Sequence, residues 1–306
     1  MKEGLHMKLY AALISLSMIW GLSFVFIKVL VDPAGVWGTV FLRCMAGALI
    51  LLPFLWWQRK HLVRPLPWKS LGVVGIFNAG LPWGLIALSE TTINSSTAAV
   101  LNALTPVCTA LIGYLFFSIV LSKKQWAGVG IGFIGIVVIM DFNVDEILGQ
   151  DFIGIGTMIL ATACYGFASQ YTKRHLQNAG VLLVTTVSLL VGAAVGGIGM
   201  LITQNPIPSE AFFSPMIWVS IIGLGCFGSG IAHLLFYYMI EKGSAEFATS
   251  VTYLIPLTAM VWGSVLLGET LTRNLTMGLV MIFVGIYLSN RKSQPLQKPW
   301  KTSKAG

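Results

Sequence analysis

The sequence predicts an all-α integral membrane protein in which ten transmembrane helices form two inverted five-helix repeats. Three observations support this fold class. Of the 306 residues, 56% are hydrophobic and only 10% are charged, whereas soluble domains carry about 25% charged residues. Most of the chain falls into apolar runs long enough to cross a bilayer. Part of the first half also returns at a fixed distance later in the chain, which indicates a duplicated unit.

A membrane helix needs about 20 mostly apolar residues, and ten runs reach or approach that length. The runs are 9–31, 36–57, 68–89, 95–117, 126–140, 152–171, 182–203, 216–240, 244–267 and 276–288. The fifth and tenth are short, so we expect local bilayer thinning or extension into flanking residues. The first run exceeds a signal-peptide core and no cleavage-site pattern follows it, which favours a retained helix.

Charges alternate between the two sets of connections. Basic residues gather near the N-terminus, at 59–69, at 123–124, at 173–174, at 242 and after 290, whereas the other connections are mainly acidic. Basic loops stay cytoplasmic, so we expect a multi-pass protein of the cell (inner or plasma) membrane with both termini in the cytoplasm. The net charge of +8 then reflects topology in the lipid bilayer and does not indicate nucleic acid as a partner.

The duplication covers both halves of the chain. Pairs at an offset of 150 are Pro106/Pro256, Gly113/Gly263, Leu121/Leu271, Gly128/Gly278, Phe133/Phe283, Gly135/Gly285 and Ile136/Ile286. Other pairs, including Trp20/Tyr165, lie at an offset of 145. We therefore expect one repeat at 1–145, a second at 146–290 and a basic cytoplasmic tail at 291–306. Because five is odd, the second copy is inserted upside down. Inverted repeats are typical of secondary transporters, whose substrate site lies near the midplane.

Three segments resemble the drug/metabolite transporter superfamily, EamA-type: WGLSFVFIK at 20–28, FLR at 41–43 and residues 98–106. The resemblance extends over nearly the whole chain. It implies a ten-helix carrier, in most cases an exporter of amino acids and related metabolites. It also implies a central cavity lined by spans 1, 3, 4, 6, 8 and 9, with spans 5 and 10 at the periphery.

Two cations lie within the predicted spans. Arg43 is about seven residues inside span 2, where a charge is expensive and usually faces the bundle interior. It either favours a substrate carboxylate or bonds a polar neighbour and holds the fold. Lys28 lies about one turn from the outer end of span 1, which favours snorkelling to the headgroups, with an inward position beside Arg43 as the alternative.

Few titratable groups are available for coupling to protons. His233 lies inside an apolar run. It is either a proton-binding group or a neutral, hydrogen-bonded core residue. Glu246 begins span 9, where the helix dipole favours an acid. Glu90 ends span 3, where we expect an interface charge. Proton coupling, downhill facilitation and exchange therefore all stay open.

Aromatic and amide residues on the implied cavity spans form the predicted substrate-binding set together with Arg43 and His233. Its members are Trp20, Arg43, Asn78, Trp83, Asn102, Tyr165, Gln170, His233, Tyr237 and Tyr253. Apolar walls with a few convergent polar groups suit a small-molecule site, although each residue singly could serve packing. Pro106 and Pro256 fall mid-span and can act as hinges or as static kinks.

The motifs that are missing narrow the function. No phosphate-loop or HExxH motif occurs, so we expect no enzyme, no catalytic residue, no metal and no cofactor. We predict a secondary transmembrane transporter that exports small amino-acid-like metabolites by alternating access. A multidrug, sugar or nucleotide carrier of the same fold is the alternative, and a non-transporting membrane protein is the hypothesis from another class. GxxxG pairs at 128–132 and 192–196 suit bundle packing and also allow a homodimer.

Overall fold

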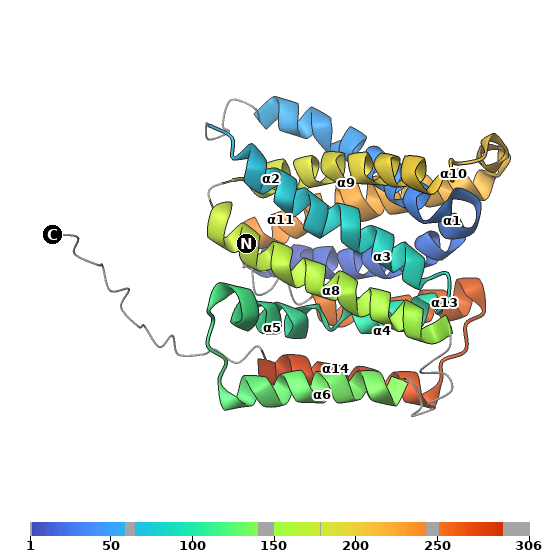
Figure 1. Cartoon of the computed structure of the whole chain (residues 1–306). Coiled ribbons are helices and arrows are strands. Elements are labelled where there is room, and N and C mark those ends of the chain that lie inside the picture. Colours follow the sequence, from blue (N-terminus) through green and yellow to red (C-terminus); the bar gives the residue numbers. More distant parts are fainter. Residues whose placement is uncertain (1, 59–64, 140–149, 178, 243–250, 290–306) are drawn as a thin grey trace.

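The computed structural model describes residues 2–58, 65–139, 150–177, 179–242 and 251–289, and every regular element in these ranges is a helix (Figure 1). The first two predicted spans lie in α1 (Lys2–Gln58), in which two helices meet at a sharp turn at Gly35, where the backbone is not helical. Gly35 has φ 68° and ψ 173°, and a positive φ is open to glycine at little steric cost. The turn therefore needs no separate loop.

The third and eighth predicted spans share an unusual feature, a π-helical segment in the middle. The third span comprises α2 (Trp68–Gly75), η2 (Ile76–Gly80) and α3 (Leu81–Ser89), and the eighth comprises α10 (Pro215–Ile221), η4 (Ile222–Ile231) and α11 (Ala232–Lys242). Residues 76–80 correspond to 226–230 at the offset of 150, so the two π segments occupy equivalent places. Such segments are frequent at functional sites.

The fourth span is broken and the ninth is continuous where it is described. Helices α4 (Ser95–Asn102) and α5 (Thr105–Phe117) meet at an angle of 43°. Pro106 lies in the first turn of α5, where a missing N–H is tolerated. Its repeat partner Pro256 is buried inside α13 (Val251–Leu267). The predicted start of the ninth span, with Glu246, lies outside the described residues.

The remaining helices complete the bundle. They are α6 (Lys123–Ile139), α8 (Gln150–His175), α9 (Val181–Thr203), η3 (Ser209–Phe213) and α14 (Arg273–Ser289). Within the described ranges, five helical segments are each long and apolar enough to cross a membrane, and the bent pair α4–α5 makes a sixth. The main core cluster draws buried side chains from both halves of the chain, including Leu16, Leu101, Met158 and Ile282. The two halves therefore share one core.

Helices α6 and α14 lie side by side at one edge of the bundle (Figure 1). A Cβ placed on Gly285 would meet the backbone of Gly128 and Gly132, and one placed on Gly135 would meet the carbonyl of Gly278. The partner numbers fall on one helix as they rise on the other, so the two helices run antiparallel. Gly128 corresponds to Gly278, and Gly135 corresponds to Gly285. The contact between Gly128 and Gly285 is therefore repeated by its counterpart, the contact between Gly278 and Gly135, as the predicted inverted repeat requires.

This close contact gives a testable prediction, because the backbones leave no room for a methyl group. An alanine Cβ at Gly285 would lie 2.7 Å from Gly128 O and 2.8 Å from Gly132 N. We expect Gly285→Ala to cost about 1–3 kcal/mol of stability through overpacking, or roughly 2–10 °C in Tm measured in detergent. Gly130→Ala on α6 is the matched control, since a Cβ there meets nothing within 4 Å. Equal changes in Tm for the two variants would contradict the predicted interface.

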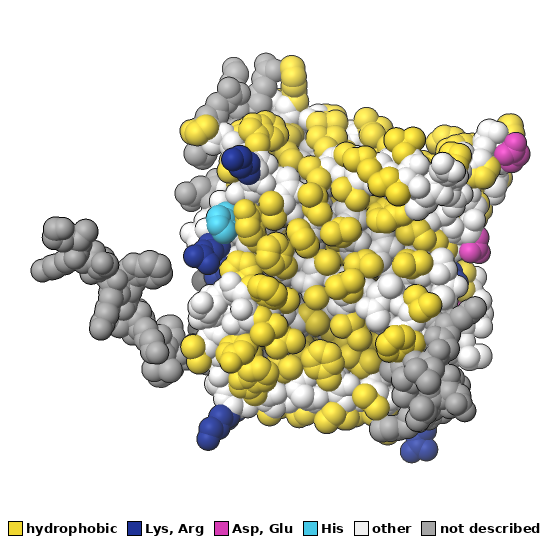
Figure 2. All heavy atoms as spheres, viewed as in Figure 1, with side chains coloured by type: hydrophobic (Ala, Val, Ile, Leu, Met, Phe, Trp, Pro, Cys, Tyr) yellow, Lys and Arg dark blue, Asp and Glu magenta, His cyan; other side chains and the backbone are white. Residues whose placement is uncertain are grey.

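Large hydrophobic side chains cover the sides of the bundle, and described charges gather at its two ends (Figure 2). Trp57, Leu201 and Val265 are among the exposed apolar residues. We call the end that holds Lys69, Lys123 and Lys173 the basic end. The opposite end, which holds Asp32, Glu210 and Glu269, is the acidic end. This distribution matches a chain solvated by lipid along its sides and by water at its ends.

Candidate functional site

A guanidinium group lies in the middle of the helix bundle. Arg43 is 8% exposed, and its Cζ atom lies 3.6 Å from the centroid of the Trp83 ring. Its Nε donates a hydrogen bond to Ser229 Oγ over 3.1 Å. Ser229 belongs to η4, so Arg43 connects the first half of the chain with the π segment of the second. A cation above a desolvated aromatic face gains about 2 kcal/mol.

The same π segment positions two rings beside this group. Trp20 donates from Nε1 to Gly228 O over 3.0 Å, and His233 Nδ1 lies 2.8 Å from Ser229 O. The Trp20 and His233 rings meet edge to face with centroids 5.9 Å apart, and Phe236 contacts the other side of Trp20 at 5.7 Å. The polar atoms of both Trp20 and His233 therefore have partners within the bundle.

A second pair of rings lies at the equivalent places of the repeat. Tyr165 lies near both Trp83 and Arg43. Trp20 corresponds to Tyr165 at an offset of 145, and Trp83 corresponds to His233 at an offset of 150. The residues equivalent to the neighbours Trp20 and His233 thus also lie near one another. Arg43 breaks the symmetry, because its counterpart at 188 is an uncharged serine.

Five predicted site residues therefore come together: Trp20, Arg43, Trp83, Tyr165 and His233. The others are placed elsewhere or less closely. Gln170 Nε2 donates to Thr109 O over 3.3 Å between α8 and α5, and Tyr253 meets Phe283 on α14. Asn78 is half-buried within η2, and the side chain of Tyr237 lies outside the described residues.

Asn102 occupies a distinctive place at the break in the fourth span. It is the last residue of α4, and its backbone carbonyl accepts a hydrogen bond from Thr105 Oγ1 over 2.7 Å. Its side-chain Oδ1 is buried, and the described part of the chain offers it no donor. An unpaired buried acceptor costs free energy, so Asn102 is a candidate to bind a polar substrate group.

The acidic end differs from the sequence-based expectation. Lys28 does not extend to the surface, because Nζ donates to the carbonyl of Glu90 and, over 3.2 Å, to that of Ile93. Glu90 is 0% exposed, so its interpretation as an interface charge is wrong. The chain leaving α3 folds inward at this point. The Lys28 ammonium group was expected to reach the headgroups. It instead donates hydrogen bonds to these two backbone carbonyls.

A second contact at the acidic end, which the sequence does not signal, joins the two halves of the chain. Glu269 Oε1 accepts from Ser95 N at 2.7 Å, and Oε2 accepts from Ser96 N at 3.0 Å and from Ser96 Oγ. Asn94 Oδ1 caps Thr97 N over 2.8 Å. A carboxylate at a helix N-terminus accepts hydrogen bonds from the free amides there and interacts favourably with the helix dipole. The Asn-Ser-Ser sequence signals this N-terminus, but nothing in the sequence shows that Glu269 reaches it. We call the contact of Glu269 with Ser95 and Ser96 the latch.

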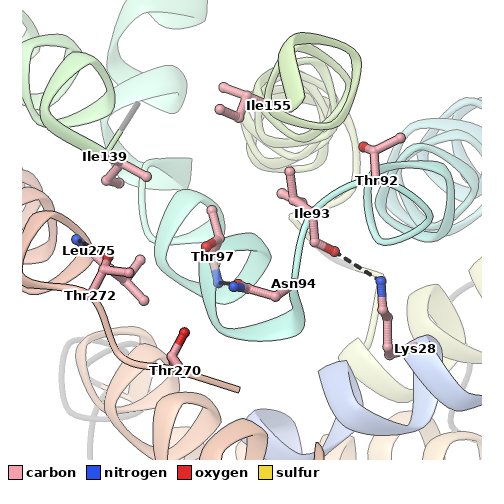
Figure 3. A pocket seen from close by; sticks show the side chains of 10 residues that line it. All are labelled: Lys28, Thr92, Ile93, Asn94, Thr97, Ile139, Ile155, Thr270, Thr272 and Leu275. Atoms are coloured by element: carbon pink, nitrogen blue, oxygen red, sulfur yellow. Dashed lines mark hydrogen bonds between the residues drawn. The ribbon is translucent and has the colours of Figure 1, made fainter. Parts of the chain in front are cut away.

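A cavity of about 480 Å³ lies beside the latch (Figure 3). Hydroxyl and amide side chains give it a polar lining, and Lys28 lies at one side. Its lining residues are Lys28, Thr92, Ile93, Asn94, Thr97, Ile139, Ile155, Thr270, Thr272 and Leu275. They come from both halves of the chain. A volume of this size is sufficient for a small metabolite.

Comparison with known proteins identifies the family to which this architecture belongs. The model of the EamA-like transporter family matches the chain twice, over residues 7–141 and over residues 152–291. The chain belongs to the EamA-like transporter family. This membership confirms the resemblance inferred from the first, second and fourth spans, as well as the ten-helix, two-repeat fold. The chain is accordingly a multi-pass membrane protein, and its family and relatives point to transporters and not to enzymes.

The chain is similar over most of its length to transporters and other proteins from several organisms. An uncharacterized inner membrane transporter, YedA of Escherichia coli K12, is 28% identical over 92% of this chain and 90% of its own length. An uncharacterized transporter of Clostridium kluyveri is 26% identical over 90% and 89%, and the protein PagO of Salmonella typhimurium is 24% identical over 89% and 90%. One crystal structure of a protein aligns with a TM-score of 0.59 at 14% identity, covering 95% of this chain and 98% of that chain. That likeness shows the fold alone.

Proposed function

We propose that the protein is a secondary carrier that exports small amino-acid-like metabolites by alternating access. The observation that carries this proposal is the state of Arg43. In the described part of the chain, its hydrogen bond runs through Nε to Ser229, which leaves the two terminal nitrogens for a ligand. A planar guanidinium binds a carboxylate through two parallel hydrogen bonds. Trp83 fixes the plane of the group from one side.

The surroundings of Arg43 support a small substrate with an apolar part. Trp20, Phe236, Trp83 and Tyr165 provide aromatic walls near the group. Pockets of this composition, with few polar groups among aromatic side chains, are typical of small-molecule sites. A zwitterion with an apolar side chain satisfies both features. The broken fourth span, with its 43° bend between Asn102 and Thr105, just before Pro106, offers a joint for the required opening and closing.

The second candidate function is a carrier of cationic compounds. Such a carrier needs a buried acid to bind its substrate. Glu90 provides one. However, Lys28 and Arg43 both lie within electrostatic range of it, and a third cation would be repelled by them. We therefore favour substrates that carry a carboxylate.

Counterflow in liposomes tests the proposed function. Purified protein is reconstituted into liposomes loaded with a mixed amino-acid pool, and uptake of labelled candidates is followed with and without a pH gradient. We expect uptake of at least one zwitterionic or anionic compound that depends on internal substrate, and none in liposomes without protein. Uptake of cationic drugs with no uptake of any amino acid would instead support the second candidate. Absence of flux for every class tested would favour a non-transporting protein.

A further inference from the structure

One buried carboxyl group has no hydrogen-bond partner in the part of the chain that the structure describes. Glu90 follows the last residue of α3 and is 0% exposed. Among the described residues, neither Oε1 nor Oε2 has a hydrogen-bond partner. An ionised carboxylate buried without donors is costly, whereas a protonated carboxyl group is far cheaper to bury. The group therefore fits this arrangement in its neutral form.

Charged groups face Glu90 from each side, but their hydrogen bonds are made elsewhere. Lys28 and Arg43 on α1 and Glu269 beyond α13 are all within electrostatic range of it, and Tyr165 on α8 is within range of Arg43. Lys28 donates to two backbone carbonyls, and Arg43 donates to Ser229. Glu269 accepts from the latch amides. Glu90 is thus the member of this cluster whose charge state is not fixed by a hydrogen bond.

The contacts of Lys28 connect this carboxyl group to the latch. Its two acceptors are the carbonyls of Glu90 and Ile93, which bracket the turn that leads into α4. Asn94 and the latch residues follow directly. Ionised Glu90 would attract the Lys28 ammonium group, because an opposite charge is its strongest available partner. Movement of that group away from the two carbonyls would release the turn and, with it, the first turn of α4.

We propose that Glu90 is the proton-binding residue of this carrier, and that loss of its proton opens the acidic end by withdrawing Lys28 from the turn before α4. The proton passes from the Glu90 carboxyl group to water, leaving a carboxylate, and returns by the same route. The nearest described cavity is the one beside the turn, which Lys28 lines together with Thr92, Ile93 and Asn94, so the proton would pass to water on that side (Figure 3). Linkage is reciprocal, so opening of the acidic end in turn favours release of the proton.

The physiological meaning of this residue rests on the proposed carrier function, but its test does not need a substrate. Protein in lipid nanodiscs is studied between pH 5 and pH 9 by infrared difference spectroscopy and by amide hydrogen exchange corrected for intrinsic rates. Glu90→Gln mimics the protonated form and retains the size of the side chain. Glu210→Gln, at an exposed acid of the same end, is the matched control. Wild type and both variants are compared under identical conditions.

We expect the wild type to lose a protonated-carboxyl carbonyl band as the pH rises, with a parallel increase of at least tenfold in exchange at Ser95 and Ser96. In Glu90→Gln this band should be missing and exchange should stay at the low-pH value throughout. Glu210→Gln should behave as the wild type. A pH-independent wild type, or the same pH profile in wild type and Glu90→Gln, would overturn the proposal. Failed counterflow combined with the expected spectra would remove the carrier function and leave the proton site.

Discussion

Substitution of Arg43 by methionine is expected to slow counterflow of carboxylate-bearing substrates at least tenfold. Methionine retains an unbranched side chain that can cover Trp83, but it provides no charge and no donor. Hydrogen bonds to charged groups contribute about 1.5–3 kcal/mol each, which corresponds to roughly a 10- to 100-fold loss in affinity. Arg43→Lys should retain part of the activity, because its charge persists while its planar stacking and paired donors are lost.

Controls can separate a binding role of Arg43 from a structural one. Removal of this buried charge leaves Ser229 satisfied, since Ser229 Oγ also donates to Leu224 O over 3.1 Å. We therefore expect Arg43→Met to be purified in normal yield with a Tm within a few degrees of wild type. Arg273→Met, at an exposed arginine of the acidic end, should transport normally. Full activity in Arg43→Met, or an equal loss for uncharged substrates, would exclude the role in carboxylate binding.

The fold could be predicted because the lipid bilayer restricts what a sequence can do. Within the bilayer the backbone polar groups must be satisfied inside the protein, which long apolar helices do, so ten apolar runs and one repeated unit suffice to define the architecture. The packing of α6 against α14 reflects the repeat, because Gly128 contacts Gly285 and their repeat counterparts, Gly278 and Gly135, contact each other. Boundaries were less predictable. The predicted gap between spans 1 and 2 is reduced to a tight turn at Gly35, and both π segments interrupt runs that looked uniform.

The central site was predictable in part, for a similar reason. A charge or an aromatic residue deep in a span has few places to go, so Trp20, Arg43, Trp83, Tyr165 and His233 converge in the bundle interior. The acidic end was not predictable in this way. Glu90 and Glu269 each follow the end of a span, where water is the usual surrounding. Only the tertiary structure shows that one folds under Lys28 and that the other caps α4.

The latch leads to the second prediction with a large effect, in which loss of Glu269 opens the acidic end. Its carboxylate holds two backbone amides and the Ser96 hydroxyl group of the opposite half. Loss of charge-assisted hydrogen bonds worth about 1.5–3 kcal/mol should raise the open population roughly 10- to 100-fold. Glu269→Gln retains one acceptor oxygen but no charge, so its effect should fall between wild type and Glu269→Ala.

Thiol labelling measures this opening directly. Ala98 in α4 is 0% exposed, so a cysteine at this position in a background without Cys44, Cys108, Cys164 and Cys226 reacts with a maleimide only when the acidic end opens. We expect the labelling rate to rise in the order wild type, Glu269→Gln, Glu269→Ala, while Glu210→Ala leaves it unchanged. Rates that do not follow this order would show that the latch does not hold the end closed. The latch joins the two halves of the chain. The expected order of labelling rates would therefore also show that Glu269, in the second repeat, controls access to the first repeat.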